Sequence, residues 1–137
     1  MGNSGFYCTK AQLFWVCALL QIRGVNILLV EDHEDTRTVL ANLLEHAGHH
    51  AIVASGYTEA LRFLVRVPAD VLLCDLGLPD GDGLDLASKA KALRPKIRTI
   101  ALTARASLAD KELGRQAGFD HYLTKPFDFH QLRTLLP

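Results

Sequence analysis

Apolar and polar residues follow two alternating periods along residues 25–137, and this pattern predicts strands and helices in turn. Short apolar runs that end in polar residues predict five strands, over residues 26–30, 51–54, 70–75, 97–103 and 119–123. Between these runs apolar residues recur at helical spacing, and each such segment stops near a glycine or proline: Gly48, Pro68, Pro95 and Gly118. Strands that alternate with helices through short connections favour a parallel, doubly wound α/β sheet.

Three of the predicted helices begin beside residues that suit a helix start. Thr58 and Asp128 are expected to cap the helices that follow them, and Ser107 with Asp110 resembles a capping box. A last helix carries Leu132, Leu135 and Leu136 to the end of the chain.

Residues 1–24 do not follow this alternation, so the sequence divides into an N-terminal extension over 1–24 and one domain over 25–137. Residues 13–20 form an apolar run without amphipathic spacing. Its flanks do not match a signal peptide, and it is far shorter than the ~18 apolar residues that span a bilayer. Because exposed apolar surface is unfavourable, we expect this run to be covered by a helix on the domain or by a second copy in a homodimer.

The overall charge argues against several classes of function. Among 137 residues, 15 are Lys or Arg and 15 are Asp or Glu, so the formal net charge is zero. A neutral chain does not predict direct nucleic-acid binding or a polybasic membrane patch. The three cysteines do not form a disulfide framework, which favours a reducing, cytoplasmic setting.

Polar side chains capable of chemistry end four of the predicted strands: Glu31-Asp32, Asp75, Thr103 and Lys125. The carboxyl ends of parallel strands meet at one edge of a sheet, where ligands bind. One pocket would then hold three carboxylates, a hydroxyl and an ammonium group. Carboxylates in such proximity repel one another unless a cation lies among them, and Mg²⁺ suits oxygen ligands of this kind.

Each residue of this group can be given a role from its charge. Asp32 and Asp75 are expected to bind Mg²⁺ directly, Glu31 through water, and Gly77 through its backbone carbonyl. Asp75 is the candidate nucleophile for an electrophilic phosphorus atom.

Lys125 would neutralise the transferring phosphoryl group, and Thr103 would form a hydrogen bond with it. We expect a cis peptide bond at Pro126, which turns the Lys125 ammonium toward Asp75. His33, beside the acidic pair, is expected at the rim of the pocket.

These residues, together with the loop Leu78-Pro79-Asp80-Gly81-Asp82-Gly83, resemble the receiver domain of two-component response regulators over about residues 26–136. The resemblance implies a flavodoxin-like (βα)5 fold with strand order 2-1-3-4-5. It also implies that Asp75 is the phosphoacceptor, that Thr103 and Tyr122 form a switch, and that a histidine kinase or histidine phosphotransfer protein is the partner. Such a domain is not an enzyme in the usual sense. The loop and the stretch around Lys125 look like the receiver at the end of a hybrid histidine kinase.

Two other functions use the same kind of fold. An aspartate-nucleophile, Mg²⁺-dependent phosphatase usually carries a second acid two residues after the nucleophile, where this chain has Gly77. A flavin or nucleotide binder needs a phosphate-cradling loop after its first strand, where the acidic residues 31–35 would repel phosphate. The sequence also departs from the receiver pattern at Glu31, in place of Asp, and at Gly77, in place of a polar residue. The second difference bears on the lifetime of a phosphoryl group on Asp75.

Overall fold

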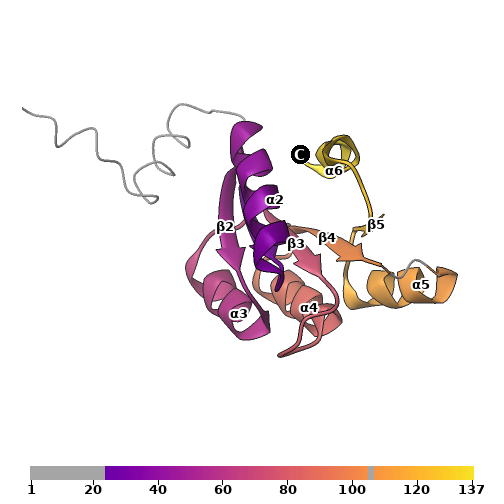
Figure 1. The fold of residues 1–137 in the computed structure, drawn as a ribbon. Coiled ribbons are helices and arrows are strands. Elements are labelled where there is room, and N and C mark those ends of the chain that lie inside the picture. The colour runs from indigo at the N-terminus through magenta and orange to yellow at the C-terminus, as the bar shows by residue number, and fades with distance from the viewer. Residues whose placement is uncertain (1–23, 105–106) are drawn as a thin grey trace, which may run out of the picture.

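The computed structural model describes residues 24–104 and 107–137. In that part of the chain a five-stranded parallel sheet is covered by helices on both faces (Figure 1). The strands are β1 (Asn26–Val30), β2 (His50–Ala54), β3 (Val71–Asp75), β4 (Arg98–Thr103) and β5 (His121–Thr124). The helices are α2 (Glu34–His46), α3 (Tyr57–Arg66), α4 (Gly83–Leu93), α5 (Leu108–Ala117) and α6 (Phe129–Leu135). The strand order β2-β1-β3-β4-β5 confirms the predicted α/β fold.

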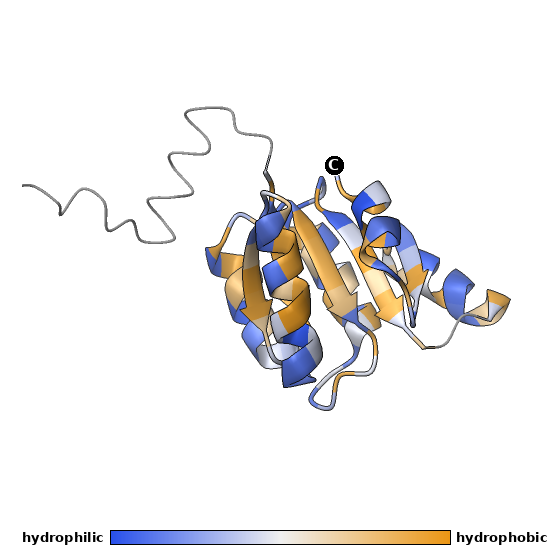
Figure 2. Ribbon diagram, turned by 45° about the horizontal axis from the view of Figure 1, so that its top comes forward, coloured by the Kyte–Doolittle hydropathy of each residue, from blue (hydrophilic) through white to orange (hydrophobic). Residues whose placement is uncertain are grey.

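Every residue of β1 and β3 is buried, which explains why these strands are continuous apolar runs (Figure 2). Successive side chains of a strand point to opposite faces of the sheet. Leu28 of β1 therefore packs in the core beneath α3 and α4, whereas Ile27 packs in the core beneath α2 and α6. A central strand covered on both faces holds its carboxyl end in one place, and β1 and β3 are the strands that lead into the acidic residues.

The helix boundaries agree with most of the predicted signals. Ser107 accepts a hydrogen bond from the Asp110 amide, and Asp128 forms a capping box with Gln131. Gly48 and Gly118 have φ angles of 94° and 109°, the left-handed region in which a glycine ends a helix without steric cost. None of the described helices has the length and apolar character that crossing a membrane requires.

The prediction that Thr58 caps a helix is wrong. Helix α3 begins at Tyr57, after Gly56 at the cap position, so Thr58 lies inside the helix. The side chain that accepts hydrogen bonds from the first amides of α3 belongs to Asp80, in the loop after β3.

The apolar run at residues 13–20 lies outside the described residues, so its expected covering stays a prediction. The division of the chain at residue 24 is likewise a prediction.

Candidate functional site

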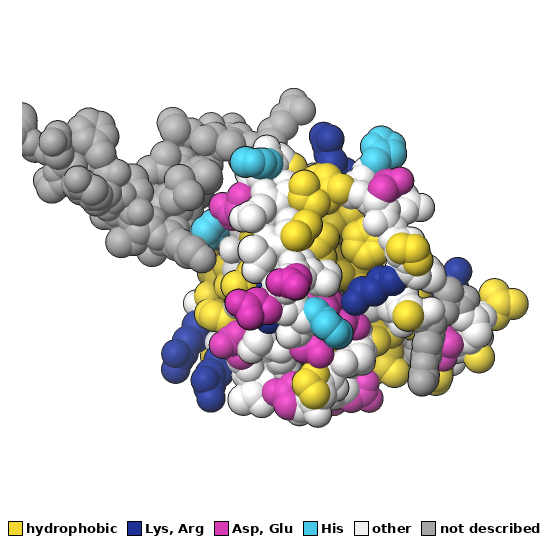
Figure 3. Space-filling model, viewed as in Figure 1, with side chains coloured by type: hydrophobic (Ala, Val, Ile, Leu, Met, Phe, Trp, Pro, Cys, Tyr) yellow, Lys and Arg dark blue, Asp and Glu magenta, His cyan; other side chains and the backbone are white. Residues whose placement is uncertain are grey.

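The predicted site residues come together at the carboxyl edge of the sheet, around a cleft of about 590 Å³. Asp32, Asp75, Thr103 and Lys125 all line it, together with Tyr122. They come from the ends of four different strands, as the pattern of strand ends predicted. Figure 3 shows several acidic side chains and a histidine gathered on this face of the molecule, with basic side chains beside them.

Lys125 pairs with two of the acids at once. Its Nζ lies 3.1 Å from Oδ2 of Asp75 and 3.2 Å from Oε2 of Glu31. The backbone amide of Lys125 donates to the carbonyl of Thr103, 2.7 Å away, which holds the end of β5 against β4. The peptide bond between Lys125 and Pro126 is cis. The ammonium group is therefore held between β1 and β3, with 28% of the lysine side chain exposed.

The acidic pair after β1 contains one buried and one partly exposed side chain. Glu31 is completely buried, whereas the side chain of Asp32 is 27% exposed and faces the cleft. Nη1 of Arg37 donates to the backbone carbonyl of Glu31, at 2.9 Å, and so fixes the turn between β1 and α2. His33 is 74% exposed at the rim, and its Nδ1 lies 3.3 Å from Oε1 of Glu31.

Burial and charge act differently on the two buried acids. Burial, together with the neighbouring charge of Asp75, raises the pKa of Glu31, although Lys125 opposes the shift. Burial also opposes ionisation of Asp75, but the Gly77 amide and the Lys125 ammonium donate to this carboxylate and together lower its pKa. Burial disfavours the charged form of Lys125 too, yet the hydrogen bond and charge of Asp75, with those of Glu31, raise its pKa. Asp75 is thus a carboxylate next to an ammonium group at neutral pH.

The loop after β3 contributes main-chain groups to the cleft. The amide of Gly77 donates to Oδ1 of Asp75 at 2.9 Å, so that each oxygen of this carboxylate has a donor. A Cβ atom at position 77 would meet only Oδ1 of Asp75, at the ordinary contact distance of 3.7 Å. A side chain at this position would therefore not prevent the main chain from approaching the cleft.

The acidic group has the composition and spacing of a cation site. One ligand atom from each of Glu31, Asp32, His33 and Asp75 lies within 4.8 Å of the others. Among the described residues, Oδ1 of Asp32 is buried and lacks a hydrogen-bond partner, although Nδ1 of His33 lies 3.5 Å away, at the limit of a hydrogen bond. A buried carboxylate oxygen without a donor is unfavourable, and a hard divalent cation at this point would satisfy it. The residues therefore fit a divalent metal ion with oxygen ligands.

Thr103 and Tyr122 lie on the side of the cleft formed by β4 and β5. Thr103 is 5% exposed at the end of β4. The hydroxyl of Tyr122 donates to the backbone carbonyl of Asp110 in α5, at 3.2 Å. The tyrosine ring packs against Gly114, where an added Cβ atom would overlap it. Tyr122 thus connects the cleft to the packing of α5 on the sheet.

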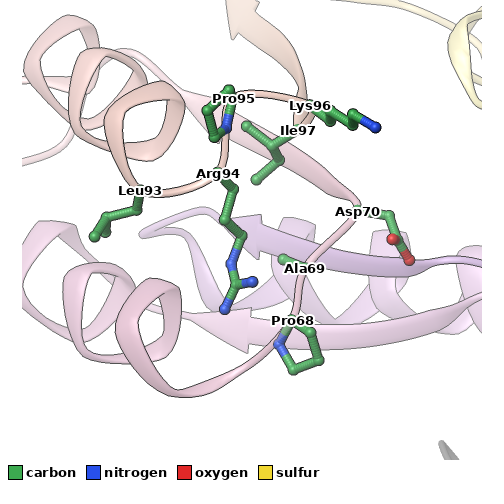
Figure 4. A pocket seen from close by; sticks show the side chains of 8 residues that line it. All are labelled: Pro68, Ala69, Asp70, Leu93, Arg94, Pro95, Lys96 and Ile97. Carbon is green, nitrogen blue, oxygen red and sulfur yellow. The ribbon is translucent and has the colours of Figure 1, made fainter.

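A second hollow lies at the opposite edge of the sheet, between the ends of α3 and α4 (Figure 4). Arg94 extends from the end of α4 toward Pro68, and its Nη2 donates to the carbonyls of Val67 and Leu64, at 2.9 and 3.4 Å. These bonds satisfy the last carbonyls of α3. The hollow contains none of the predicted site residues, and Arg94 has a structural role there.

Two residues of the carboxyl edge are not among the predicted site residues. The side chain of Arg37 donates a hydrogen bond to the backbone carbonyl of Glu31 in the acidic pair. No local sequence pattern predicts that an arginine in the first turns of a helix makes this contact. Asp82 lines the cleft and caps α4 by accepting from the Leu84 amide at 2.9 Å.

Fold and site together define a parallel α/β protein with an acidic, cation-fitting cleft at the carboxyl edge of its sheet. Residues 27–137 match the family model of the response regulator receiver domain. The chain therefore belongs to this family, and it is a receiver domain, a signalling module of two-component systems.

Curated relatives agree with this assignment. An uncharacterized 14.6 kDa protein of Leptolyngbya boryana is 40% identical over 107 residues, which cover 76% of this chain and 81% of that protein. The sensory transduction protein RegX3 of Mycobacterium tuberculosis is 38% identical, over 78% of this chain and 47% of RegX3. The chain thus spans less than half the length of RegX3.

Solved structures share the fold. A response regulator of Burkholderia pseudomallei, crystallised with a phosphorylated aspartic acid, calcium ion and citrate, has a TM-score of 0.78 and 30% identity. The match covers 82% of this chain and 66% of that one. A CheY-like receiver domain protein of Methanospirillum hungatei has a TM-score of 0.77 and 31% identity, over 81% of this chain and 89% of the other.

Proposed function

We propose that Asp75 accepts a phosphoryl group from a phosphohistidine, carried by a histidine kinase or a histidine phosphotransfer protein. The observation that carries this proposal is the position of Asp75 at the end of β3, where its carboxylate lies in the cleft between the Lys125 ammonium and the acidic group around Asp32. The Burkholderia pseudomallei structure, with its phosphorylated aspartic acid, supports the same chemistry.

In the transfer, a carboxylate oxygen of Asp75 forms a bond to phosphorus as the bond between phosphorus and the donor nitrogen breaks. The lowered pKa of Asp75 keeps this nucleophile ionised at neutral pH. Lys125, already 3.1 Å from Asp75, would then stabilise the negative charge on the phosphoryl oxygens. Bound Mg²⁺ would supply further neutralisation of that charge. Asp32 and Asp75 would hold the ion directly, with the Gly77 carbonyl, and Glu31 would act through water.

The output of the domain would be a change of shape on the face formed by α5, β5 and α6. Thr103 would form a hydrogen bond with the new phosphoryl group, and Tyr122 would turn inward as Thr103 moves. A phosphoryl group adds a charge of about −1.5 to −2. Contacts with this charge differ between the two conformations of Thr103 and Tyr122, and such a difference is what shifts the population from one conformation to the other. The setting that we propose is the cytoplasm, where the domain would either work alone or form the receiver at the end of a hybrid histidine kinase.

A phosphatase is less well supported by the site. The position two residues after Asp75 holds Gly77, whose amide donates to Asp75 and which has no side chain to act as an acid or base.

Incubation with acetyl phosphate and Mg²⁺ tests the proposal. We expect an acid-labile mass increase of one phosphoryl group per chain, which EDTA prevents. Rapid catalytic release of phosphate, with no phosphorylated protein at any time, would favour the phosphatase instead.

A further inference from the structure

The loop that carries Gly77, over residues 76–82, is held at both of its ends. At its start, Gly77 donates to Asp75, and the amide of Leu76 donates to the carbonyl of Leu102 at 3.1 Å. At its end, Asp82 caps α4. Figure 1 shows the loop leaving β3 and passing the end of α3 at which that helix begins.

Asp80 connects the middle of this loop to α3. Its Oδ1 accepts a hydrogen bond from the Tyr57 amide at 2.7 Å, and its Oδ2 accepts one from the Thr58 amide at 3.2 Å. The first amides of a helix lack partners inside the helix, and the cap position of α3 is Gly56, which has no side chain to offer. A carboxylate more than twenty residues away along the chain therefore caps α3.

The contact between the loop and α3 is close. A Cβ atom at Gly56 would lie 2.6 Å from Oδ1 of Asp80, and one at Gly81 would overlap the ring of Tyr57. The hydroxyl of Tyr57 donates to Asp85 in α4, and Lys89 of α4 donates to that hydroxyl at 2.6 Å. The first residue of α3 is thus in contact with both the loop and the helix that follows the loop.

The far end of α3 is also fixed. Arg94 binds the last carbonyls of this helix, as described above, and Leu64 and Ala60 of α3 are buried in the core. Because α3 is fixed at its C-terminal end and along its buried face, a residue that binds its N-terminal end is held in place as well. Asp80 lies only three residues after Gly77, so the position of Asp80 on α3 limits where Gly77 can lie.

We infer that Asp80 is a positioning residue for the phosphoacceptor site: by capping α3 it holds the loop so that Gly77 meets Asp75 and the cation. This inference rests on the proposed function. The amides of Tyr57 and Thr58 lower the pKa of the exposed Asp80 carboxyl, as expected for a carboxylate cap. Residues that orient the groups around a metal ion typically change its affinity about 10–100-fold when they are removed.

Asp80→Ala is the direct test, with Glu59→Ala as the matched control. Glu59 also binds an amide near the start of α3, since its Oε1 accepts from the Ser55 amide, just before the cap residue Gly56, at 2.8 Å. Among the described residues, no hydrogen bond or ion pair joins Glu59 to the loop. Both variants remove one carboxylate from the same helix end. Mg²⁺ affinity is measured by titration, and exchange of the Gly77 amide hydrogen is measured by NMR.

We expect Asp80→Ala to bind Mg²⁺ about tenfold more weakly and to exchange the Gly77 amide hydrogen faster, while Glu59→Ala changes neither. Asp80→Asn, which keeps one acceptor for the Tyr57 amide, should lie between Asp80→Ala and the unmodified protein. If Asp80→Ala does not fold, the Mg²⁺ affinity of Asp80→Asn still tests the positioning role of Asp80.

Unchanged Mg²⁺ affinity in the Asp80 variants, with faster exchange at Tyr57 and Thr58 alone, would show that Asp80 is only a structural cap and would overturn the inference. The proposed function would survive that result. It fails separately if the unmodified protein neither binds Mg²⁺ nor accepts a phosphoryl group.

Discussion

Nζ of Lys125 lies 3.1 Å from Oδ2 of Asp75, although fifty residues of chain separate them. The same ammonium lies 3.2 Å from the buried Glu31. One cation cannot balance three neighbouring carboxylates, and Oδ1 of Asp32 is buried without a hydrogen-bond partner in the described part of the chain. This imbalance of charge is the physical reason to expect a divalent ion in the cleft.

The first prediction concerns the two neighbouring acids after β1. We expect Asp32→Ala to weaken Mg²⁺ binding more than Glu31→Ala, because Asp32 faces the cleft and is proposed as a direct ligand. In the unmodified protein, Mg²⁺ at ten times its dissociation constant should raise the free energy of unfolding by about 1.4 kcal/mol. Thermal unfolding with and without Mg²⁺ measures this gain. An equal loss in both variants would mean that the two acids share the role.

The second prediction concerns the ring of Tyr122. Gly114→Ala would place a Cβ atom where the ring now lies, so the ring must move and its hydrogen bond to the Asp110 carbonyl should break. NMR spectra of the unphosphorylated variant should show shifted resonances of Tyr122 and of its neighbours in β4 and β5. Spectra that change only within α5 would show that the ring is not coupled to the sheet.

The third prediction concerns the pH dependence of stability that arises from Asp120, a residue away from the cleft. Asp120 accepts from Lys91 at 2.7 Å and from the Thr99 amide at 2.9 Å. Burial opposes ionisation, but these donors prevail and hold the pKa of Asp120 below its ordinary value of 3.8. A lowered pKa in the folded state stabilises the protein above pH 4 or so, and this contribution is lost as the pH falls through the folded-state pKa.

We therefore expect Asp120→Asn to reduce the free energy of unfolding by about 1 kcal/mol at pH 7, after allowance for solvent screening of a partly exposed group. Denaturant titrations should show the difference shrinking as the pH falls below about 4. A difference that stays constant down to pH 2 would exclude the charge of Asp120 as its cause. Phosphorylation by acetyl phosphate is the control, and it should not change.

The features that the sequence predicted most accurately are those that follow from the parallel arrangement of the strands. Asp75, Thr103 and Lys125 could be grouped because each follows an apolar run, and the carboxyl ends of parallel strands must share an edge. Contacts that depend on three-dimensional proximity could not be predicted in this way. Thr58 looked like a local cap, whereas the cap of α3 comes from Asp80, and no local pattern reports a donor and acceptor so far apart.

Helical spacing alone does not give the width of the buried face of a helix. Val39 and Leu43 recur with the apolar positions of α2, yet their exposed fractions are 57% and 37%. Spacing indicates which side of a helix faces the sheet, but the width of the buried stripe depends on the neighbours that cover it. Leu40 and Leu44, directly over the sheet, are the residues of this helix that are buried.

The most direct test of the account is to locate the phosphoryl group. The protein is phosphorylated with acetyl phosphate and Mg²⁺, the acyl phosphate is trapped by borohydride reduction, and the peptides are sequenced by tandem mass spectrometry. We predict a single modified residue, Asp75, and no modification of Asp75→Asn, whose fold should remain intact. Modification of Asp32 or another acid in the unmodified protein, or labelling that persists in Asp75→Asn, would contradict the assignment of the phosphoacceptor.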